Sequence, residues 1–143
     1  MERYERILVP LDGSQVAEAI LPEVEVMAKA FDSTIFILRS YYANVPPGID
    51  PTETQVATKK QAEDYVKKVT ERVKGNGFSA KGYTRYESDA SSAIMKHCKD
   101  HDISLIMMST HGRGGIKNII LGSVAEKVIH QATTPILLVR ATK

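Results

Sequence analysis

The chain has 143 residues, 43% of them apolar and 25% charged, which is the composition of a water-soluble globular protein. Its 19 basic and 17 acidic residues are scattered and leave a net charge of only +2, so nucleic acid is not an expected partner. The apolar runs are strand-sized, the first six residues are polar, and one cysteine builds no disulfide framework. We therefore expect no membrane-spanning segment, no secretory signal, and a cytoplasmic location.

Strand and helix patterns alternate along the chain, which is typical of a parallel sheet covered by helices on both faces. Short apolar runs predict five strands, at residues 7–11, 34–38, 79–86, 103–109 and 135–139. The third run is polar enough to lie at an edge of the sheet. Helical spacing of apolar residues predicts helices after Ser14 to Ala28, over 56–74, after residue 89 and over 122–131. The predicted fold class is α/β, a doubly wound five-stranded parallel sheet in one domain spanning residues 1–143.

Helix boundaries can be assigned from capping residues. Ser14 can cap the first helix, in which Pro22 removes one hydrogen bond and predicts a bend. Residues 43–54, which contain three prolines, are predicted to form a loop able to move over the sheet edge. Asp89 or Ser88 can cap the helix that carries Ala93, Ile94 and Cys98 inward.

The most informative stretch begins where the fourth strand ends. The loop after this strand contains Gly112, Gly114 and Gly115, and Gly122 with Ser123 then opens a helix. Glycines let backbone N–H groups converge on one point, because no Cβ blocks their approach. A helix N-terminus adds unpaired donors and partial positive charge, and this combination indicates a site for an anion such as phosphate. Two cations, Arg113 and Lys117, lie in the same segment.

The same residues also allow an interpretation without a ligand. Glycines after a strand often only form a tight turn. Ser123 and Glu126 have the spacing of a capping box, in which the serine hydroxyl accepts from the N–H of Glu126. The two interpretations are compatible, because the N–H of Ser123 itself would still face outward.

Asp12 follows the first strand, and Ser109 is the last residue of the fourth strand. Ligands of doubly wound sheets bind beyond the carboxyl ends of the strands, where the strand order reverses. If the first and fourth strands are neighbours there, Asp12 and the glycine loop face one crevice. The alternative for Asp12 is an Asx turn at the start of the following helix.

Four segments of the chain resemble the universal stress protein family. They are Ile7-Leu-Val-Pro-Leu-Asp-Gly-Ser14, Leu105-Ile-Met-Met-Ser-Thr-His-Gly112, Leu121-Gly-Ser-Val-Ala-Glu-Lys-Val128 and Thr134-Pro-Ile-Leu-Leu-Val-Arg140. The resemblance implies a Rossmann-like sheet of the adenine nucleotide alpha hydrolase type. It also implies a homodimer paired through the last strand, residues 135–140.

Family members that bind ATP carry Gly, two residues, Gly, nine residues, Gly, and then Ser or Thr. Gly112 and Gly122 match the second and third glycines, and Ser123 follows. The first position holds Ser109, which is a departure from the pattern. A serine there is strained if the position needs a positive φ, and its Cβ narrows the approach of a ligand. Its hydroxyl can also donate to that ligand.

Carried over position by position, the resemblance implies a site for ATP together with Mg²⁺. Pro10, Leu11 and Asp12 would line the adenine and ribose side, and Ser40 would lie beside the base. Asp12 could accept from the ribose or approach the magnesium ion. The ribose and phosphates would be held, largely through backbone N–H groups, by Met108, Ser109, Thr110, His111, Gly112, Arg113, Gly122, Ser123 and Val124.

The remaining reactive side chains favour ordinary roles. His111 has no serine, cysteine or carboxylate at a spacing that would make it a general base, so we expect its backbone to act. His97, His101 and His130 lie on or near helix ends, which predicts surface placement or contact with terminal carbonyls. Cys98 lies in a helix stripe and is expected to be a small core residue. No catalytic residue and no dedicated metal site are predicted.

The leading hypothesis is a dimeric ATP-binding module that acts in the stress response. The alternative is a stress-related dimer that binds no nucleotide and works only through protein partners, and Ser109 is its main support. An enzyme is not expected. The first strand is not followed by the Ser-Gly-Gly-x-Asp-Ser loop of pyrophosphatase-type synthetases, and Gly122 is not part of a P-loop lysine pattern. Asp12 also lacks the acidic neighbours of a receiver domain.

Overall fold

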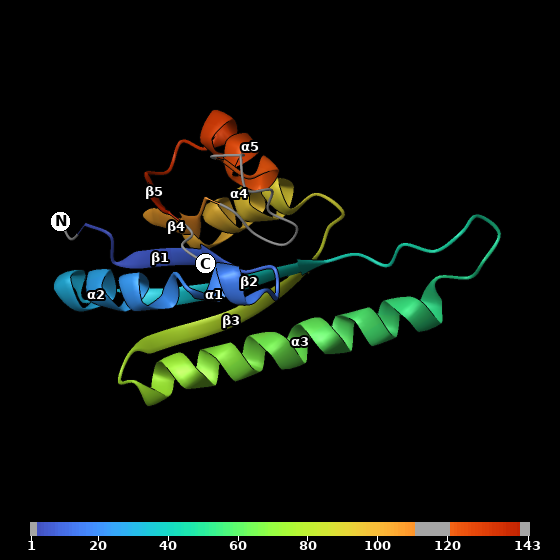
Figure 1. Cartoon of the computed structure of the whole chain (residues 1–143), viewed down its shortest axis with the longest axis horizontal. Helices are drawn as coiled ribbons and strands as arrows, with labels where there is room; N and C mark the ends of the chain where they lie inside the picture. Colours follow the sequence, from blue (N-terminus) through green and yellow to red (C-terminus); the bar gives the residue numbers. More distant parts are fainter. Residues whose placement is uncertain (1–2, 111–120, 141–143) are drawn as a thin grey trace.

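The structure is a computed structural model that describes residues 3–110 and 121–140. Its strands are β1 (Arg6–Pro10), β2 (Thr34–Tyr41), β3 (Ser79–Tyr86), β4 (Leu105–Ser109) and β5 (Ile136–Val139). Its helices are α1 (Gln15–Glu18), α2 (Leu21–Phe31), α3 (Thr52–Gly75), α4 (Ala90–His101) and α5 (Ser123–Gln131). Strands and helices alternate as predicted, and Figure 1 shows them packed in layers around one sheet.

All strand pairs are parallel, and the order across the sheet is β3-β2-β1-β4-β5. The chain runs outward from β1 to β3, then crosses to the opposite side of β1 to form β4 and β5. Leu8 on β1 pairs with Phe36 on one side and Ile106 on the other. The order therefore reverses between β1 and β4, so the condition that the first and fourth strands are neighbours is fulfilled. The prediction that the third strand lies at an edge is also confirmed.

The sheet is apolar on both faces because side chains alternate along each strand. Ile7 and Val9 pack with α1, α2 and α3, whereas Leu8 packs on the opposite face with α4 and α5. Figure 1 shows α2 and α3 on one side of the sheet and α4 with α5 on the other. The predicted doubly wound arrangement is thus confirmed.

The predicted first helix is two helices rather than one bent helix. The Ser14 Oγ accepts from the N–H of Ala17 at 3.1 Å and caps α1, as expected. α1 ends after one turn, and α2 starts at Leu21 with Pro22 in its first turn. A proline there lacks only an N–H that has no partner inside the helix. The prediction of a bend inside one helix is therefore wrong, because Pro22 lies at a helix start.

Two elements are longer than the sequence pattern predicted. β2 continues through Tyr41 instead of ending at residue 38. α3 starts at Thr52 rather than residue 56, because the N–H and hydroxyl of Thr52 both donate to Asp50 Oδ1, at 3.0 and 2.7 Å. Figure 1 shows the N-terminal part of α3 and the preceding loop projecting beyond the sheet.

The start of α4 settles which of two candidate residues caps it. Asp89 Oδ1 accepts from the N–H of Ser91 at 3.1 Å and from its hydroxyl at 2.8 Å. These hydrogen bonds to Ser91 favour the charged carboxylate, and they lower the pKa of Asp89 below its ordinary value. Asp89, not Ser88, is therefore the cap. Ala93 and Ile94 are buried as expected, and Cys98 is partly buried.

Candidate functional site

The carboxyl ends of β1 and β4 lie side by side at the point where the strand order reverses. Thr110, the residue after β4, forms backbone hydrogen bonds to two other segments of the chain. The N–H of Thr110 donates to the carbonyl of Val139 at 3.0 Å, and the carbonyl of Thr110 accepts from the N–H of Gly122 at 2.5 Å. The start of α5 therefore lies directly against the end of β4. Residues 12 apart in the sequence are brought together at this edge.

The N-terminus of α5 differs from the prediction in its capping residue. Gly122 is the cap, with φ −69° and ψ 160°, and Ser123 is the first helical residue. The N–H of Glu126 donates to the carbonyl of Gly122 at 2.9 Å, which is the first bond of the helix. The prediction of a capping box between Ser123 and Glu126 is therefore wrong, because Ser123 is the first helical residue and not the cap. In residues 3–110 and 121–140, no side chain caps this end.

A helix end that no described side chain caps has a physical consequence. The first N–H groups of a helix have no partner inside it and carry partial positive charge. At α5 these donors are the N–H groups of the residues after Gly122, whose own N–H donates to Thr110. Ser123 is exposed to solvent, and Val124 is partly exposed. The start of α5 is therefore not buried in the core.

Asp12 forms an Asx turn at the start of α1, which was the alternative to a ligand-binding role. Its Oδ1 accepts from the N–H of Ser14 at 2.9 Å and from the Ser14 hydroxyl at 2.6 Å. Gly13 between them has φ +89°, a conformation that L-residues with a side chain rarely adopt. The carboxylate of Asp12 therefore shapes the connection from β1 to α1.

The other predicted site residues divide by exposure. The side chains of Leu11 and Met108 are buried in the core, so only their backbone atoms can reach the sheet edge. Pro10, Ser40 and Ser109 are partly exposed at the ends of β1, β2 and β4. His111, Gly112 and Arg113 lie outside the described residues, as do the remaining loop glycines and Lys117.

Ser109 carries no backbone strain. It is the last residue of β4, paired in register with Val139, and it is not among the described residues with positive φ. The strain that a positive φ would impose on a serine is therefore absent. Only the Cβ and the hydroxyl distinguish this position from the glycine of the family pattern.

The prediction that His97 lies at the surface is wrong. Its side chain is 1% exposed, because residue 97 falls on the stripe of α4 that packs against β2 and β3. His130 is exposed and His101 is partly exposed. Burial raises the pKa of the Cys98 thiol, which fits a packing role. The periodicity of α4 could have identified His97, since it lies one turn beyond Ala93 and Ile94.

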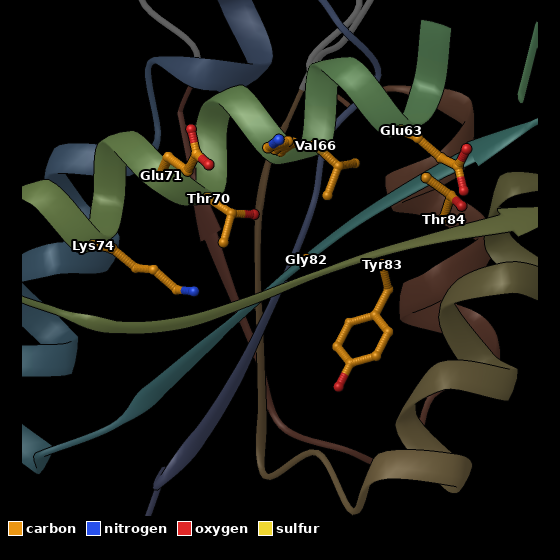
Figure 2. Close-up of a pocket in the computed structure, with 9 residues that line it drawn as sticks. Glu63, Val66, Thr70, Glu71, Lys74, Gly82, Tyr83 and Thr84 are labelled. Atoms are coloured by element: carbon orange, nitrogen blue, oxygen red, sulfur yellow. The ribbon is translucent and has the colours of Figure 1, made fainter. Parts of the chain in front are cut away.

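A groove of about 310 Å³ lies elsewhere, between α3 and β3. Charged residues of α3, among them Glu63, Glu71 and Lys74, line it together with Gly82 on β3, and Figure 2 shows the helix lying alongside this strand. The Thr70 hydroxyl is buried beneath them and has no hydrogen-bond partner among the described atoms. The groove lies along the free edge of β3 and not at the carboxyl ends of β1 and β4. The sequence pattern gave no indication of it, because charges on a long helix usually face solvent.

Two further observations concern metal ions and membranes. In the described ranges, 3–110 and 121–140, no three His, Cys, Asp or Glu side chains lie close enough together to hold a metal ion. None of the helices within those ranges combines the length and apolarity needed to cross a membrane.

Comparison with known proteins identifies close relatives of the whole chain. The model of the universal stress protein family matches residues 3–140. The universal stress protein MJ0531 of Methanocaldococcus jannaschii is 31% identical, and the alignment covers 98% of this chain and 84% of the relative. The solved structure of MJ0577, a universal stress protein of the same organism, superimposes with a TM-score of 0.85 at 25% identity and covers 98% of both chains.

More distant structures share the fold. A universal stress protein solved in complex with cAMP has a TM-score of 0.73 at 18% identity and covers 99% of this chain and 100% of its own. An Arabidopsis thaliana member with AMP bound has a TM-score of 0.68 at 13% identity, covering 96% of this chain and 92% of its own. At these identities the likeness establishes the α/β fold alone.

Proposed function

The chain belongs to the universal stress protein family, and on that premise we propose that it is an ATP-binding module of the stress response. The nucleotide would bind with Mg²⁺ at the carboxyl ends of β1 and β4. The family consists of stress proteins, and membership in it gives no indication of a catalytic activity. The proposed role is therefore to hold a nucleotide and respond to it rather than to turn it over.

One observation carries this proposal. The hydrogen bond from the N–H of Gly122 to the carbonyl of Thr110 joins the uncapped start of α5 to the strand end at which the sheet reverses. Open α/β sheets bind ligands at such a reversal, and helix N-termini there commonly hold phosphate. A polyanionic ligand fits this edge because it would supply acceptors for the first N–H groups of α5, which no side chain in the described ranges caps.

The proposed contacts follow the family pattern. The backbone N–H groups of Gly112, Ser123 and Val124 would hold the phosphates, and Gly122, which has no side chain, would let them approach. The Ser123 hydroxyl and the Arg113 guanidinium would add donors. The ribose would lie near Ser109, Thr110 and the backbone of His111. The base would lie between β1 and β2, in contact with Pro10, Ser40 and the backbone of Leu11 and Met108. That two members of this fold were solved with cAMP and AMP agrees with an adenine nucleotide as ligand.

Asp12 would serve both the fold and the ligand. One of its carboxylate oxygens accepts from Ser14, and a carboxylate at this position could also approach the ribose or the magnesium ion.

Asp12→Asn and Asp12→Ala separate the two roles. Asparagine keeps an oxygen that can accept from the N–H of Ser14, so its thermal midpoint should stay near that of the natural chain. Its affinity for ATP with magnesium should nevertheless fall, by roughly tenfold for one lost charge-assisted contact. Alanine loses both the oxygen that accepts from Ser14 and the proposed contact with the ligand. It should therefore also lower the free energy of unfolding, by about 1 kcal/mol. Calorimetric titration and thermal unfolding measure the two effects. If the asparagine variant binds ATP with magnesium as tightly as the natural chain, Asp12 has only its structural role.

The proposed assembly is a homodimer paired through residues 135–140. β5 is hydrogen-bonded to β4 on one side, and Leu137 on it is exposed. A second copy could extend the sheet along this strand.

The direct test of the proposal is the content of the purified protein. Mass spectrometry of small molecules released by denaturation should detect an adenine nucleotide, and titration with ATP and magnesium should give saturable heat. If no nucleotide is released and no heat is measured above dilution, the proposal is wrong.

A second candidate function is a stress protein that binds no nucleotide and acts through protein partners. The observation that favours it is Ser109, whose Cβ stands at a strand end where the family pattern has glycine.

Ser109→Gly distinguishes the two functions. If the Cβ only narrows the site, the glycine variant should bind ATP several-fold more tightly than the natural chain, which itself should bind. Binding that appears only in the variant would favour the second function. Titration calorimetry on both chains makes this comparison. Circular dichroism is the control, since glycine at a strand end is expected to weaken the fold slightly, by about 0.5 kcal/mol.

A further inference from the structure

The face of the sheet covered by α4 contains a group of polar side chains that surrounds one buried histidine. We call this group the His97 cluster, and it consists of Tyr83 and Arg85 on β3 with His97, Asp100 and His101 on α4. The His97 ring lies 4.7 Å from the Tyr83 ring and 4.1 Å from the His101 ring, centroid to centroid. With 1% of its surface exposed, His97 is among the most deeply buried side chains described. The cluster thus joins the edge strand β3 to the helix that covers it.

The hydrogen bonds of the cluster define the protonation state of His97. The Arg85 Nε–H donates to His97 Nδ1 at 3.2 Å, and a terminal nitrogen of Arg85 donates to Asp100 Oδ2 at 2.5 Å. Because Nδ1 accepts, the single proton of the neutral imidazole is on Nε2. Nε2 is buried and has no hydrogen-bond partner within the described residues. The imidazole is therefore held neutral, with one nitrogen bonded and the other unsatisfied.

An apolar side chain of similar size would avoid this unsatisfied N–H, which costs about 1–3 kcal/mol in a protein interior. Packing alone thus gives no reason for a histidine here. We propose that His97 is an acid-sensitive contact, which holds α4 to β3 while Nδ1 accepts from Arg85 and releases them when Nδ1 takes up a proton.

Protonation would convert the only acceptor in this contact into a donor. The new Nδ1–H would face the Arg85 Nε–H across 3.2 Å, and the buried imidazolium would lie directly against a second positive charge. His101 stacks on the same ring and would add a third charge if protonated. Asp100 is the carboxylate of the cluster, and it is already paired with Arg85. From β2 the contact is the apolar Phe36 ring, over which Arg6 and Lys81 lie, so that side supplies no negative charge either.

The direction of the pH effect follows from these contacts. Burial, reinforced by His101 and Arg85, lowers the pKa of His97 to about 4, whereas a histidine in the unfolded chain titrates near 6.5. The unfolded chain therefore binds the proton first as pH falls. The stability that neutral His97 contributes is complete above about pH 6.5 and is lost progressively toward about pH 4. Since β3 has a neighbouring strand on one side only, it is the element that this loss would loosen.

Urea unfolding at about pH 7 and about pH 5 tests the proposal on the full chain. The unfolding equilibrium constant of the natural chain should rise on the order of tenfold more than that of His97→Gln over this range. Glutamine keeps an oxygen that can accept from Arg85 but does not titrate. His130→Gln is the matched control, because His130 is exposed, and it should behave as the natural chain does. Equal losses in the natural chain and in His97→Gln would overturn the proposal.

Nuclear magnetic resonance provides a second measurement that needs no altered histidine. The imidazole carbon resonances of His97 in the natural chain should titrate well below about 6.5, the ordinary midpoint of a histidine. In Arg85→Leu, which removes both the donor to Nδ1 and a positive charge, the His97 midpoint should move upward. A His97 midpoint near about 6.5, or one that Arg85→Leu leaves unchanged, would show that Arg85 does not control the proton.

Discussion

Gly82→Ala is expected to lower the free energy of unfolding by about 1–3 kcal/mol, the usual cost of overpacking a close contact. Gly82 lies in the middle of the edge strand β3, directly beneath α3. A Cβ at this position would stand 2.4 Å from Val66 Cγ1 and 2.5 Å from Thr70 Oγ1. Both side chains belong to buried, β-branched residues of a helix, in which χ1 has little freedom. Figure 2 shows Val66 and Thr70 on α3 next to the strand at Gly82. The helix must therefore move away from the strand to admit one methyl group.

Gly75→Ala is the matched control for this substitution. Gly75 is the last residue of α3, and a Cβ there would meet nothing within 4 Å. Alanine is the better helix former, so this variant should be neutral or slightly more stable. Thermal unfolding should place Gly82→Ala several degrees below the natural chain, at roughly 2–4 °C for each kcal/mol. If both variants unfold with the natural chain, α3 does not pack on β3 as closely as described.

Ser123→Asp is expected to reduce the affinity for ATP with magnesium by about tenfold to a hundredfold. A carboxylate in the first turn of α5 would lie where the phosphates are proposed to bind and would repel them. The same charge is favourable to the helix itself, by about 0.3–1 kcal/mol, because it lies at the positive end of the helix dipole. Affinity and stability should therefore change in opposite directions, which a general loss of structure could not produce.

Gln131→Asp provides the control for charge. It places the same carboxylate at the last residue of α5, which is exposed and lies at the other end of the helix. This variant should bind nucleotide as the natural chain does and should be slightly less stable, because the carboxylate meets the negative end of the dipole. Titration calorimetry and thermal unfolding of the two variants make the comparison. Equal affinities in Ser123→Asp and Gln131→Asp would place the phosphates elsewhere.

The layering and the edge position of β3 were predictable because they depend on patterns that repeat along the chain. Alternating apolar runs predicted five parallel strands, whereas the adjacency of β1 and β4 entered only as a condition, which the structure fulfils. Capping by Ser14 followed from local side-chain chemistry, which for α4 left Asp89 and Ser88 as candidates. These features are set by residues close in sequence or by the apolar pattern of a whole element.

The features that sequence could not supply depend on contacts between elements. Whether Pro22 bends one helix or starts another depends on where the preceding helix ends. The capping box at Ser123 had the right spacing, but the backbone places Gly122 in the extended conformation of a cap. The close approach of α3 to Gly82 could not be read from β3 alone. His97 was assigned to the surface because its position near a helix end outweighed its place on the buried stripe.

The nucleotide site was only partly predictable for a related reason. The glycine spacing indicates which backbone groups could bind phosphate, but not how residues far apart meet. In the structure Thr110 and Gly122 are in direct hydrogen-bond contact, and Asp12 already accepts from Ser14. The role of the glycines at 112, 114 and 115 stays a prediction, because these residues lie outside the described ranges.

The most direct test of the proposed site is an amide nuclear magnetic resonance titration of the full chain with ATP and magnesium. The account predicts that the amides of Gly122, Ser123 and Val124 shift together with that of Thr110, in proportion to saturation. The amide of Gly82, in the groove on the far edge of the sheet, should stay unchanged. Saturable shifts confined to the groove between α3 and β3, or no saturable shift at the start of α5, would contradict the account.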